Sequence, residues 1–229
     1  MIEAIVFDLD GLLLDSEQVW GEVREQLVKE RGGRWREQAQ TEMMGMSSVE
    51  WSRYMHDELG LSEPPEEISG EVVRRLEERY RRELPLIEGA KEAVERLAAR
   101  WPLGLASSSN RELIDLVLEL SGLAPFFRVT VSSEEVPRGK PAPDVYLEAA
   151  RGLGVPPQRC AAVEDSRNGI RSAKAAGMKV IAIPNPHFPP DDESLGLADV
   201  TLGSLAELTP ATVAGDGTGG DVAGTASAA

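Results

Sequence analysis

The chain has one cysteine, comparatively few basic residues and no long hydrophobic segment, and each shortage excludes a class of protein. A single thiol, Cys160, can form neither an internal disulfide nor the cysteine cluster of a structural zinc site, so we expect a small core residue there. With 24 Lys and Arg against 39 Asp and Glu, the 229 residues carry a formal charge of -15. This charge argues against nucleic acids and anionic membranes as partners, because both require basic surfaces.

The chain also lacks the segments that direct a protein to or into a membrane. No apolar stretch approaches the length of a transmembrane helix, and no basic region followed by a long apolar run opens the sequence. We therefore expect a cytoplasmic protein without a signal peptide, either a monomer or a weak homodimer. The length suits one large domain, or a core domain that carries an insertion.

The clearest local pattern lies at the start of the chain. Residues 4–7, Ala-Ile-Val-Phe, predict a strand buried on both faces, and Asp8, Asp10 and Gly11 follow it. In open parallel sheets, ligands bind at the carboxyl ends of the strands. Two carboxylates this close repel each other unless a cation lies beside them, so the pattern favours a divalent metal with oxygen ligands, above all Mg²⁺. On its own, the motif would also fit an acidic turn.

Residues 16–85 differ in texture from the rest of the chain. Helical patterns follow one another there, and the pairs Asp15/Gln18 and Ser47/Glu50 predict capping boxes at two of the helix starts. No strand pattern interrupts these helices. The segment therefore predicts an all-helical domain.

From residue 86 onward, strand and helix patterns alternate. The predicted strands cover residues 103–106, 128–132, 159–163 and 179–183, and the predicted helices cover 90–100, 111–121, 144–153 and 168–176. This alternation indicates an α/β fold, a Rossmann-like parallel sheet with helices on both faces. Because the first strand needs partners, we expect a core of residues 1–15 and 86–209, with the helical domain of residues 16–85 inserted. Residues 210–229 are small, polar and glycine-rich, and predict a disordered tail.

Polar residues also follow the predicted strand that ends at residue 106. Ser107 and Ser108 come directly after it, and Ser109 with Glu112 resembles a capping box at the next helix. Hydroxyls and free N–H groups at a helix N-terminus can bind an anion without a net charge. A serine-rich helix cap is the simpler interpretation of this segment alone.

Two further strand ends carry charged residues. Lys140 lies between a glycine and a proline that fix its backbone, so its ammonium can serve as a positioned charge for a phosphate. Glu164 and Asp165 follow another buried strand, where two acids are costly without a cation. Since parallel strands deliver their carboxyl ends to one edge, these residues should meet Asp8 and Asp10. A turn and a helix cap are the alternatives for each motif alone.

Taken together, these motifs resemble the four ordered motifs of the haloacid dehalogenase superfamily. The residues that carry the resemblance are Asp8-Leu9-Asp10-Gly11, Ser107, Gly139-Lys140-Pro141, and Glu164-Asp165-Ser166 with Asn168-Gly169. The similarity extends from residue 2 to about residue 209. More narrowly, the chain is similar to the branch of sugar phosphatases and β-phosphoglucomutases, which carries a helical cap inserted after the first motif.

The resemblance implies a role for each motif residue. Asp8 would be the nucleophile that forms an aspartyl-phosphate, while Asp10 would protonate the departing alcohol and later activate water. Lys140 would be catalytic as well and, with Ser107 and Ser108, would hold the transferring phosphoryl group. The implied ligands of Mg²⁺ are Asp8, the carbonyl of Asp10, Asp165 and Glu164.

The cap residues distinguish hydrolysis from intramolecular transfer. We expect Trp20 and Ser48 to face the cavity and bind substrate, with core packing as the alternative. The β-phosphoglucomutases place a histidine at the position of Trp20 and an arginine at that of Ser48, whereas the run from Asp15 to Trp20 looks more like that of hexose- and hexitol-phosphate phosphatases. We therefore predict a Mg²⁺-dependent phosphatase that acts on a small phosphorylated metabolite, a sugar or sugar-alcohol phosphate. A β-phosphoglucomutase-type sugar phosphomutase is the alternative.

Overall fold

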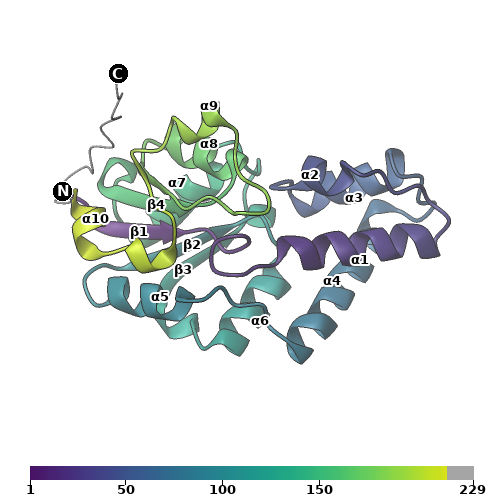
Figure 1. Ribbon diagram of the computed structural model, residues 1–229, viewed down its shortest axis with the longest axis horizontal. Helices are drawn as coiled ribbons and strands as arrows, with labels where there is room; N and C mark the ends of the chain where they lie inside the picture. Colours follow the sequence, from purple (N-terminus) through teal and green to yellow (C-terminus); the bar gives the residue numbers. More distant parts are fainter. Residues whose placement is uncertain (216–229) are drawn as a thin grey trace, which may run out of the picture.

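A six-stranded parallel sheet forms the core of the larger domain (Figure 1). The computed structural model describes residues 1–215. Its strands are β1 (Ala4–Phe7), β2 (Leu103–Ser107), β3 (Phe127–Ser132), β4 (Cys160–Glu164), β5 (Lys179–Ala182) and β6 (Val200–Thr201), in the order β3-β2-β1-β4-β5-β6. β1 therefore lies between β2 and β4, and the residues that follow these three strands are neighbours at one edge of the sheet.

Helices cover both faces of the sheet. The α-helices of this domain are α5 (Ala90–Ala98), α6 (Arg111–Ser121), α7 (Asp144–Leu153), α8 (Arg167–Ala175), α9 (Asp192–Leu195) and α10 (Pro210–Ala214). Short 3-10 helices lie at Ala124–Phe126, Ser133–Glu135, Pro157–Arg159 and Leu205–Glu207. Because side chains alternate along a strand, Ile5 and Phe7 of β1 pack with α5 and α6, while Ala4 and Val6 pack with α7 and α8. This confirms the predicted fold class.

The predicted boundaries of two helices agree with the structure to the residue. α6 and α7 span the predicted ranges, and each ends at a glycine with a positive φ, 71° at Gly122 and 70° at Gly154. Glycine adopts this left-handed conformation without the steric cost of a side chain, so it terminates a helix at a defined position. Over residues 1–215, no helix combines the length and the apolar character needed to cross a bilayer.

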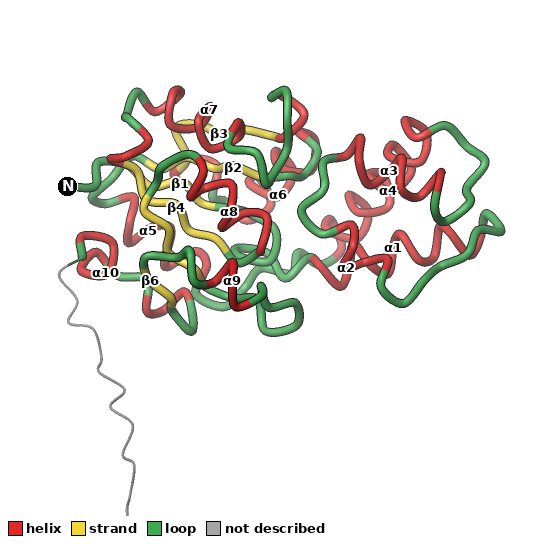
Figure 2. The backbone as a smooth tube through the Cα atoms, turned by 90° about the horizontal axis from the view of Figure 1, so that it is seen from above, coloured by secondary structure: helices red, strands yellow, loops and turns green. Residues whose placement is uncertain are grey.

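A separate group of helices lies between β1 and β2 in sequence and beyond one end of the sheet in space (Figure 2). These helices are α1 (Glu17–Glu30), α2 (Ala39–Met43), α3 (Ser48–Asp57) and α4 (Pro65–Arg82). Their shared interior includes Trp51 of α3 together with Val72 and Leu76 of α4. We keep residues 16–85 as the proposed bounds of this helical domain.

The two predicted capping boxes of the helical domain have different outcomes. Ser47 and Glu50 form one at the start of α3, where the Ser47 N–H donates to the Glu50 carboxylate over 2.8 Å. The box predicted at Asp15 and Gln18 was wrong, since Ser16 is the N-cap of α1 and makes no side-chain cap bond. Its hydroxyl is instead a donor to Asp10, as described below. A tertiary contact has therefore replaced the local one.

The end of the chain also differs from expectation within the described residues. Residues 210–214, which we expected to be disordered, form α10, with Thr209 capping the helix and Pro210 in its first turn. Val213 is fully buried, which anchors this helix to the domain. The rest of the predicted tail, residues 216–229, lies outside the described residues.

Candidate active site

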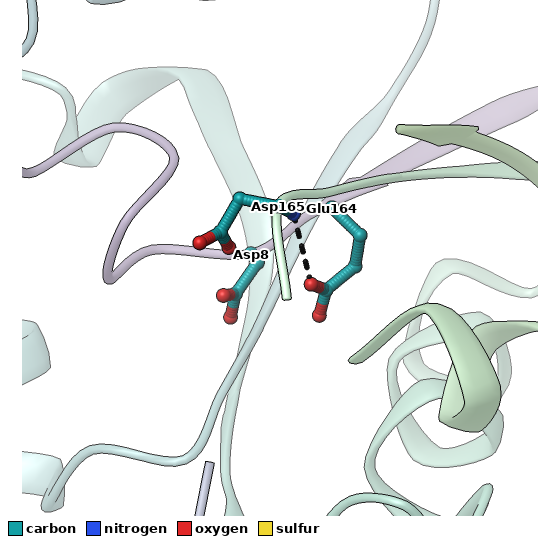
Figure 3. Close-up of side chains that lie close together, drawn as sticks. All are labelled: Asp8, Glu164 and Asp165. Atoms are coloured by element: carbon teal, nitrogen blue, oxygen red, sulfur yellow. Dashed lines mark hydrogen bonds between the residues drawn. The ribbon is translucent and has the colours of Figure 1, made fainter. Parts of the chain in front are cut away.

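Three carboxylates meet at the carboxyl edge of the sheet (Figure 3). Asp8 follows β1, Glu164 is the last residue of β4, and Asp165 comes directly after it. One oxygen from each lies within 4.8 Å of the other two, and all three residues are buried. The parallel pairing of β1 with β4 places them together, because Phe7 is opposite Val163 and the two strands end at the same level.

Lys140 connects two of these acids from the loop before α7. Its Nζ donates to Asp8 Oδ1 over 2.6 Å and to Glu164 Oε1 over 2.7 Å, and the residue is 4 % exposed. Burial by itself would lower the pKa of Lys140, but the charges of Asp8 and Glu164 outweigh it and raise this pKa above the ordinary value. The lysine is therefore a fixed cation between the two carboxylates.

Glu164 is saturated with hydrogen bonds. Besides Lys140, the hydroxyl of Tyr146 donates to its Oε1 over 2.8 Å. Its Oε2 accepts from the N–H of Asp165 over 3.0 Å and from the N–H and hydroxyl of Ser166, both over 3.1 Å. With the ammonium of Lys140, Glu164 accepts from five donors. Its carboxylate is therefore fully used in holding Lys140 and the start of α8. Tyr146, a buried residue of α7, was not predicted as part of the site.

Gly169 of α8 packs directly against this glutamate, which yields a test of the arrangement. A Cβ atom at position 169 would lie 1.7 Å from Glu164 Oε1, so even alanine requires Glu164 to move. We expect Gly169→Ala to lower the free energy of unfolding by about 1–3 kcal/mol, because overpacking displaces a buried, hydrogen-bonded group. Urea denaturation measures the change.

Gly70→Ala is the matched control for that variant. Gly70 also lies inside a helix, but a Cβ atom there would meet nothing within 4 Å. Alanine should stabilise this position by up to about 1 kcal/mol, since it restricts the unfolded backbone and favours the helix. Equal responses of the two glycines would contradict the steric explanation.

Asp165 differs from Glu164, because both its side-chain oxygens are buried and have no hydrogen-bond partner among residues 1–215. Burial, together with the charges of Glu164 and Asp8, raises the pKa of Asp165 well above its usual range. Burial also raises the pKa of Asp8 to about 8, against the opposing effect of Lys140. Gly11 leaves room beside the orphaned carboxylate, since a Cβ there would lie 2.2 Å from Asp165 Oδ2. A hard divalent cation would supply the missing partner, so these residues fit Mg²⁺.

Asp10 lies outside the three-acid cluster and is held by four neutral donors. Ser16 Oγ and Trp20 Nε1 donate to its Oδ1 over 2.7 and 3.3 Å. Ser109 Oγ and Ser107 Oγ donate to its Oδ2 over 2.7 and 3.3 Å. The carboxyl group is thereby fixed at the wall of the cavity. Sequence reasoning had not connected Ser16 with Asp10.

The predicted capping box of Ser109 and Glu112 was wrong. The N-cap of α6 is Asn110, which makes no side-chain cap bond, and Ser109 turns its hydroxyl to Asp10. Asp10, which follows the neighbouring strand β1, thus takes the Ser109 hydroxyl away from the start of the helix.

The cavity lies between the two domains. Its lining includes Asp8, Asp10, Ser108, Ser109, Lys140 and Ser166 from the sheet domain, and Glu17, Trp20, Arg24, Met43, Met44, Gly45, Met46 and Trp51 from the helical domain. Of the predicted cap residues, Trp20 lines this cavity. Ser48 does not, because it is buried and donates to Glu134 Oε1 of the sheet domain over 2.6 Å. Ser108 also connects the domains, through a 3.3 Å hydrogen bond to the carbonyl of Gly45.

A parallel sheet with acids and a buried lysine at its carboxyl edge, facing an inserted helical domain, defines a hydrolase of the haloacid dehalogenase type. Residues 2–177 match the model of the haloacid dehalogenase-like hydrolases, so the chain belongs to this family. The predicted resemblance is thereby confirmed.

Two relatives and one solved structure illustrate where the chain lies within the family. Hexitol phosphatase B of Escherichia coli K12 is 35% identical over 227 residues, which cover 91% of this chain and 95% of that protein. The phosphorylated carbohydrates phosphatase of Thermotoga maritima is 30% identical over 182 residues, 79% of this chain and 84% of that protein. The crystal structure of CbbY from Rhodobacter sphaeroides in complex with phosphate superposes with a TM-score of 0.82 at 28% identity, covering 93% of this chain and 100% of that one. The chain is a phosphoric monoester hydrolase of the haloacid dehalogenase-like family.

Proposed function

We propose that this protein is a Mg²⁺-dependent phosphatase that hydrolyses a sugar or sugar-alcohol monophosphate through an aspartyl-phosphate on Asp8. The observation that carries the proposal is the position of Asp8 at the cavity, between the ammonium of Lys140 and the unpartnered carboxylate of Asp165. The relatives named hexitol phosphatase and phosphorylated carbohydrates phosphatase support this substrate class.

In the first step, a carboxylate oxygen of Asp8 attacks phosphorus while the bond from phosphorus to the alcohol oxygen breaks. Asp10 gives its proton to that oxygen, so the substrate leaves as a neutral alcohol. In the second step, Asp10 takes a proton from water, the water oxygen attacks phosphorus, and phosphate and Asp8 are released. Lys140 offsets the charge of two anions that approach each other.

The metal would be held by Asp8, the backbone carbonyl of Asp10 and Asp165. When bound, Mg²⁺ supplies positive charge that neutralises the phosphoryl oxygens. Glu164 belongs to the same acid cluster, but both of its carboxylate oxygens already accept hydrogen bonds from protein donors. We therefore assign it the task of positioning Lys140.

The cap side of the cavity favours hydrolysis over a mutase reaction. Trp20 donates its indole N–H to Asp10 and offers no group that could move a proton. Ser48 directs its hydroxyl to Glu134 and so contributes no contact for a second phosphate.

A screen of phosphorylated metabolites for release of inorganic phosphate tests the proposed function. The assay is run with Mg²⁺ and with EDTA, and an Asp8→Asn preparation is the blank. We expect release that requires Mg²⁺ and no bisphosphate activator. Dependence on a bisphosphate would instead point to the mutase.

Asp165→Asn tests the metal assignment separately. Asparagine keeps the shape of the side chain but removes the charge that a divalent ion needs. Because even outer-shell changes weaken metal binding about 10–100-fold, we expect the Mg²⁺ concentration for half-maximal activity to rise by at least about tenfold. Asp115→Asn, on the exposed side of α6, is the control and should leave that concentration unchanged. An unaltered Mg²⁺ requirement in Asp165→Asn would remove this residue from the metal site.

A further inference from the structure

The wall of the cavity that faces the catalytic aspartates contains a second polar cluster, formed by Glu17, Arg24 and Gln40 of the helical domain. Arg24 is only 4 % exposed. Its guanidinium carbon lies 4.4 Å from the ring centre of Trp20 and 4.8 Å from that of Trp51. The two tryptophan rings thus hold a buried cation at the cavity, where both Arg24 and Glu17 are lining residues.

Gln40 holds the other two members of the cluster in place. Its side-chain oxygen accepts from Arg24 Nη1 over 3.3 Å, and its amide nitrogen donates to Glu17 Oε2 over 2.9 Å and to the Glu17 carbonyl over 3.0 Å. Within residues 1–215, Arg24 Nε is buried and has no hydrogen-bond partner, so the guanidinium keeps an unused donor. Arg24 and Glu17 both line the cavity, where a ligand can reach them.

None of these three residues has a part in the phosphoryl-transfer steps. A carboxylate beside a guanidinium offers an acceptor and donors within one small region, which matches a hydroxyl group, because a hydroxyl both donates and accepts. A second phosphate or a carboxylate would fit less well, since it would face Glu17 in a cavity whose lining has three acids and two cations, Arg24 and Lys140, the second of which is already paired with Asp8.

We propose that Arg24, Gln40 and Glu17 recognise hydroxyl groups on the alcohol half of the substrate, and that they select monophosphates of neutral polyols over esters with a second anionic group. This inference rests on the proposed phosphatase function and specifies the part of the site that chooses the substrate. Arg24 and Glu17 make the contacts, and Gln40 is a positioning residue.

A comparison of three substrates on the wild-type protein gives the first test. Sorbitol 6-phosphate and hexyl phosphate have carbon chains of the same length, but only the first carries hydroxyls, whereas fructose 1,6-bisphosphate adds a second anion. Because hydrogen bonds to charged groups are strong and leaving them unmade is costly, we expect kcat/KM for sorbitol 6-phosphate to exceed that for hexyl phosphate by about 100-fold or more. The bisphosphate should be at least about tenfold worse than the polyol monophosphate.

Arg24→Met then assigns the preference to the cluster. Methionine keeps an apolar side chain of similar length beside the tryptophans and removes every donor. We expect the preference for sorbitol 6-phosphate over hexyl phosphate to fall to about tenfold or less, mainly through KM. Arg79→Met is the matched control, an exposed arginine of the same domain paired with Glu22, and should retain the full preference. If Arg24→Met does not fold, Gln40→Met replaces it, and the same fall in the preference for sorbitol 6-phosphate over hexyl phosphate is expected.

The outcomes separate the inference from the proposed function. If the wild-type protein releases phosphate from none of the three esters, the phosphatase proposal fails. Two results would leave the phosphatase proposal intact and overturn hydroxyl recognition by this cluster. One is a kcat/KM for hexyl phosphate or the bisphosphate equal to that for sorbitol 6-phosphate. The other is an equal loss of kcat/KM for both monoesters in Arg24→Met.

Discussion

Replacing Asp8 by asparagine is expected to reduce phosphate release by at least about 10⁴-fold, because loss of the nucleophile in a covalent mechanism removes the reaction path itself. The amide oxygen of asparagine can still accept the hydrogen bond from Lys140, and the substitution alters no packing volume. Since burial raises the pKa of Asp8 to about 8, a neutral side chain at this position also avoids a desolvation cost. The variant should therefore unfold at no lower urea concentration than the wild type.

Phosphate release and urea denaturation together check this prediction. Asp15→Asn is the control, since Asp15 is exposed and lies outside the cavity lining. Turnover by Asp8→Asn at a rate near that of the wild type would show that another residue attacks phosphorus. A large loss of stability would show instead that the inactivity reflects unfolding.

Lys140→Met should impair both stability and activity. The ammonium is the cation between Asp8 and Glu164, at 2.6 and 2.7 Å, and all three residues are buried. Removing one partner of a buried ion pair leaves uncompensated charge, so we expect the free energy of unfolding to fall by about 3–5 kcal/mol. Activity should fall by about 10²–10³-fold or more, as when a donor that stabilises developing charge is deleted.

Urea denaturation measures the change in the free energy of unfolding. EDTA is present because a bound divalent ion would compensate part of the charge that the substitution removes. Arg138→Met, two residues away, is the matched control: its guanidinium lies on the surface and pairs with Asp144 over 3.0 Å. Exposed pairs contribute little, so its free energy of unfolding should change by less than about 1 kcal/mol. Similar losses in the two variants would mean that Lys140 has no special structural role.

The parts of this protein that could be predicted are those that depend on neighbouring residues. The boundaries of α6 and α7 follow from apolar periodicity and from terminal glycines, which act within one turn of the helix. The strand at residues 4–7 followed by Asp8 and Asp10 was recognisable for the same reason. Knowledge that parallel strands share a carboxyl edge was enough to expect Lys140 and Asp165 beside Asp8.

The failures share a physical cause. The capping boxes predicted at Asp15 and at Ser109 were both wrong, and in each case a nearby serine hydroxyl, that of Ser16 or Ser109, donates to Asp10 instead of capping a helix. Tyr146 carries no local signal that its hydroxyl reaches Glu164. These contacts depend on how helices lie over the sheet, which no short window of residues contains.

Periodicity and the geometry of parallel strands were enough to predict the alternation of elements, the α/β class and the charged residues at the strand ends. How the acids divide their tasks became visible in the folded chain. Glu164 accepts from five donors, Asp165 is left without one among the described residues, and Arg24 lies against two tryptophans from different helices. Whether a buried charge has a partner depends on the three-dimensional packing around it, and that packing gives each residue its function.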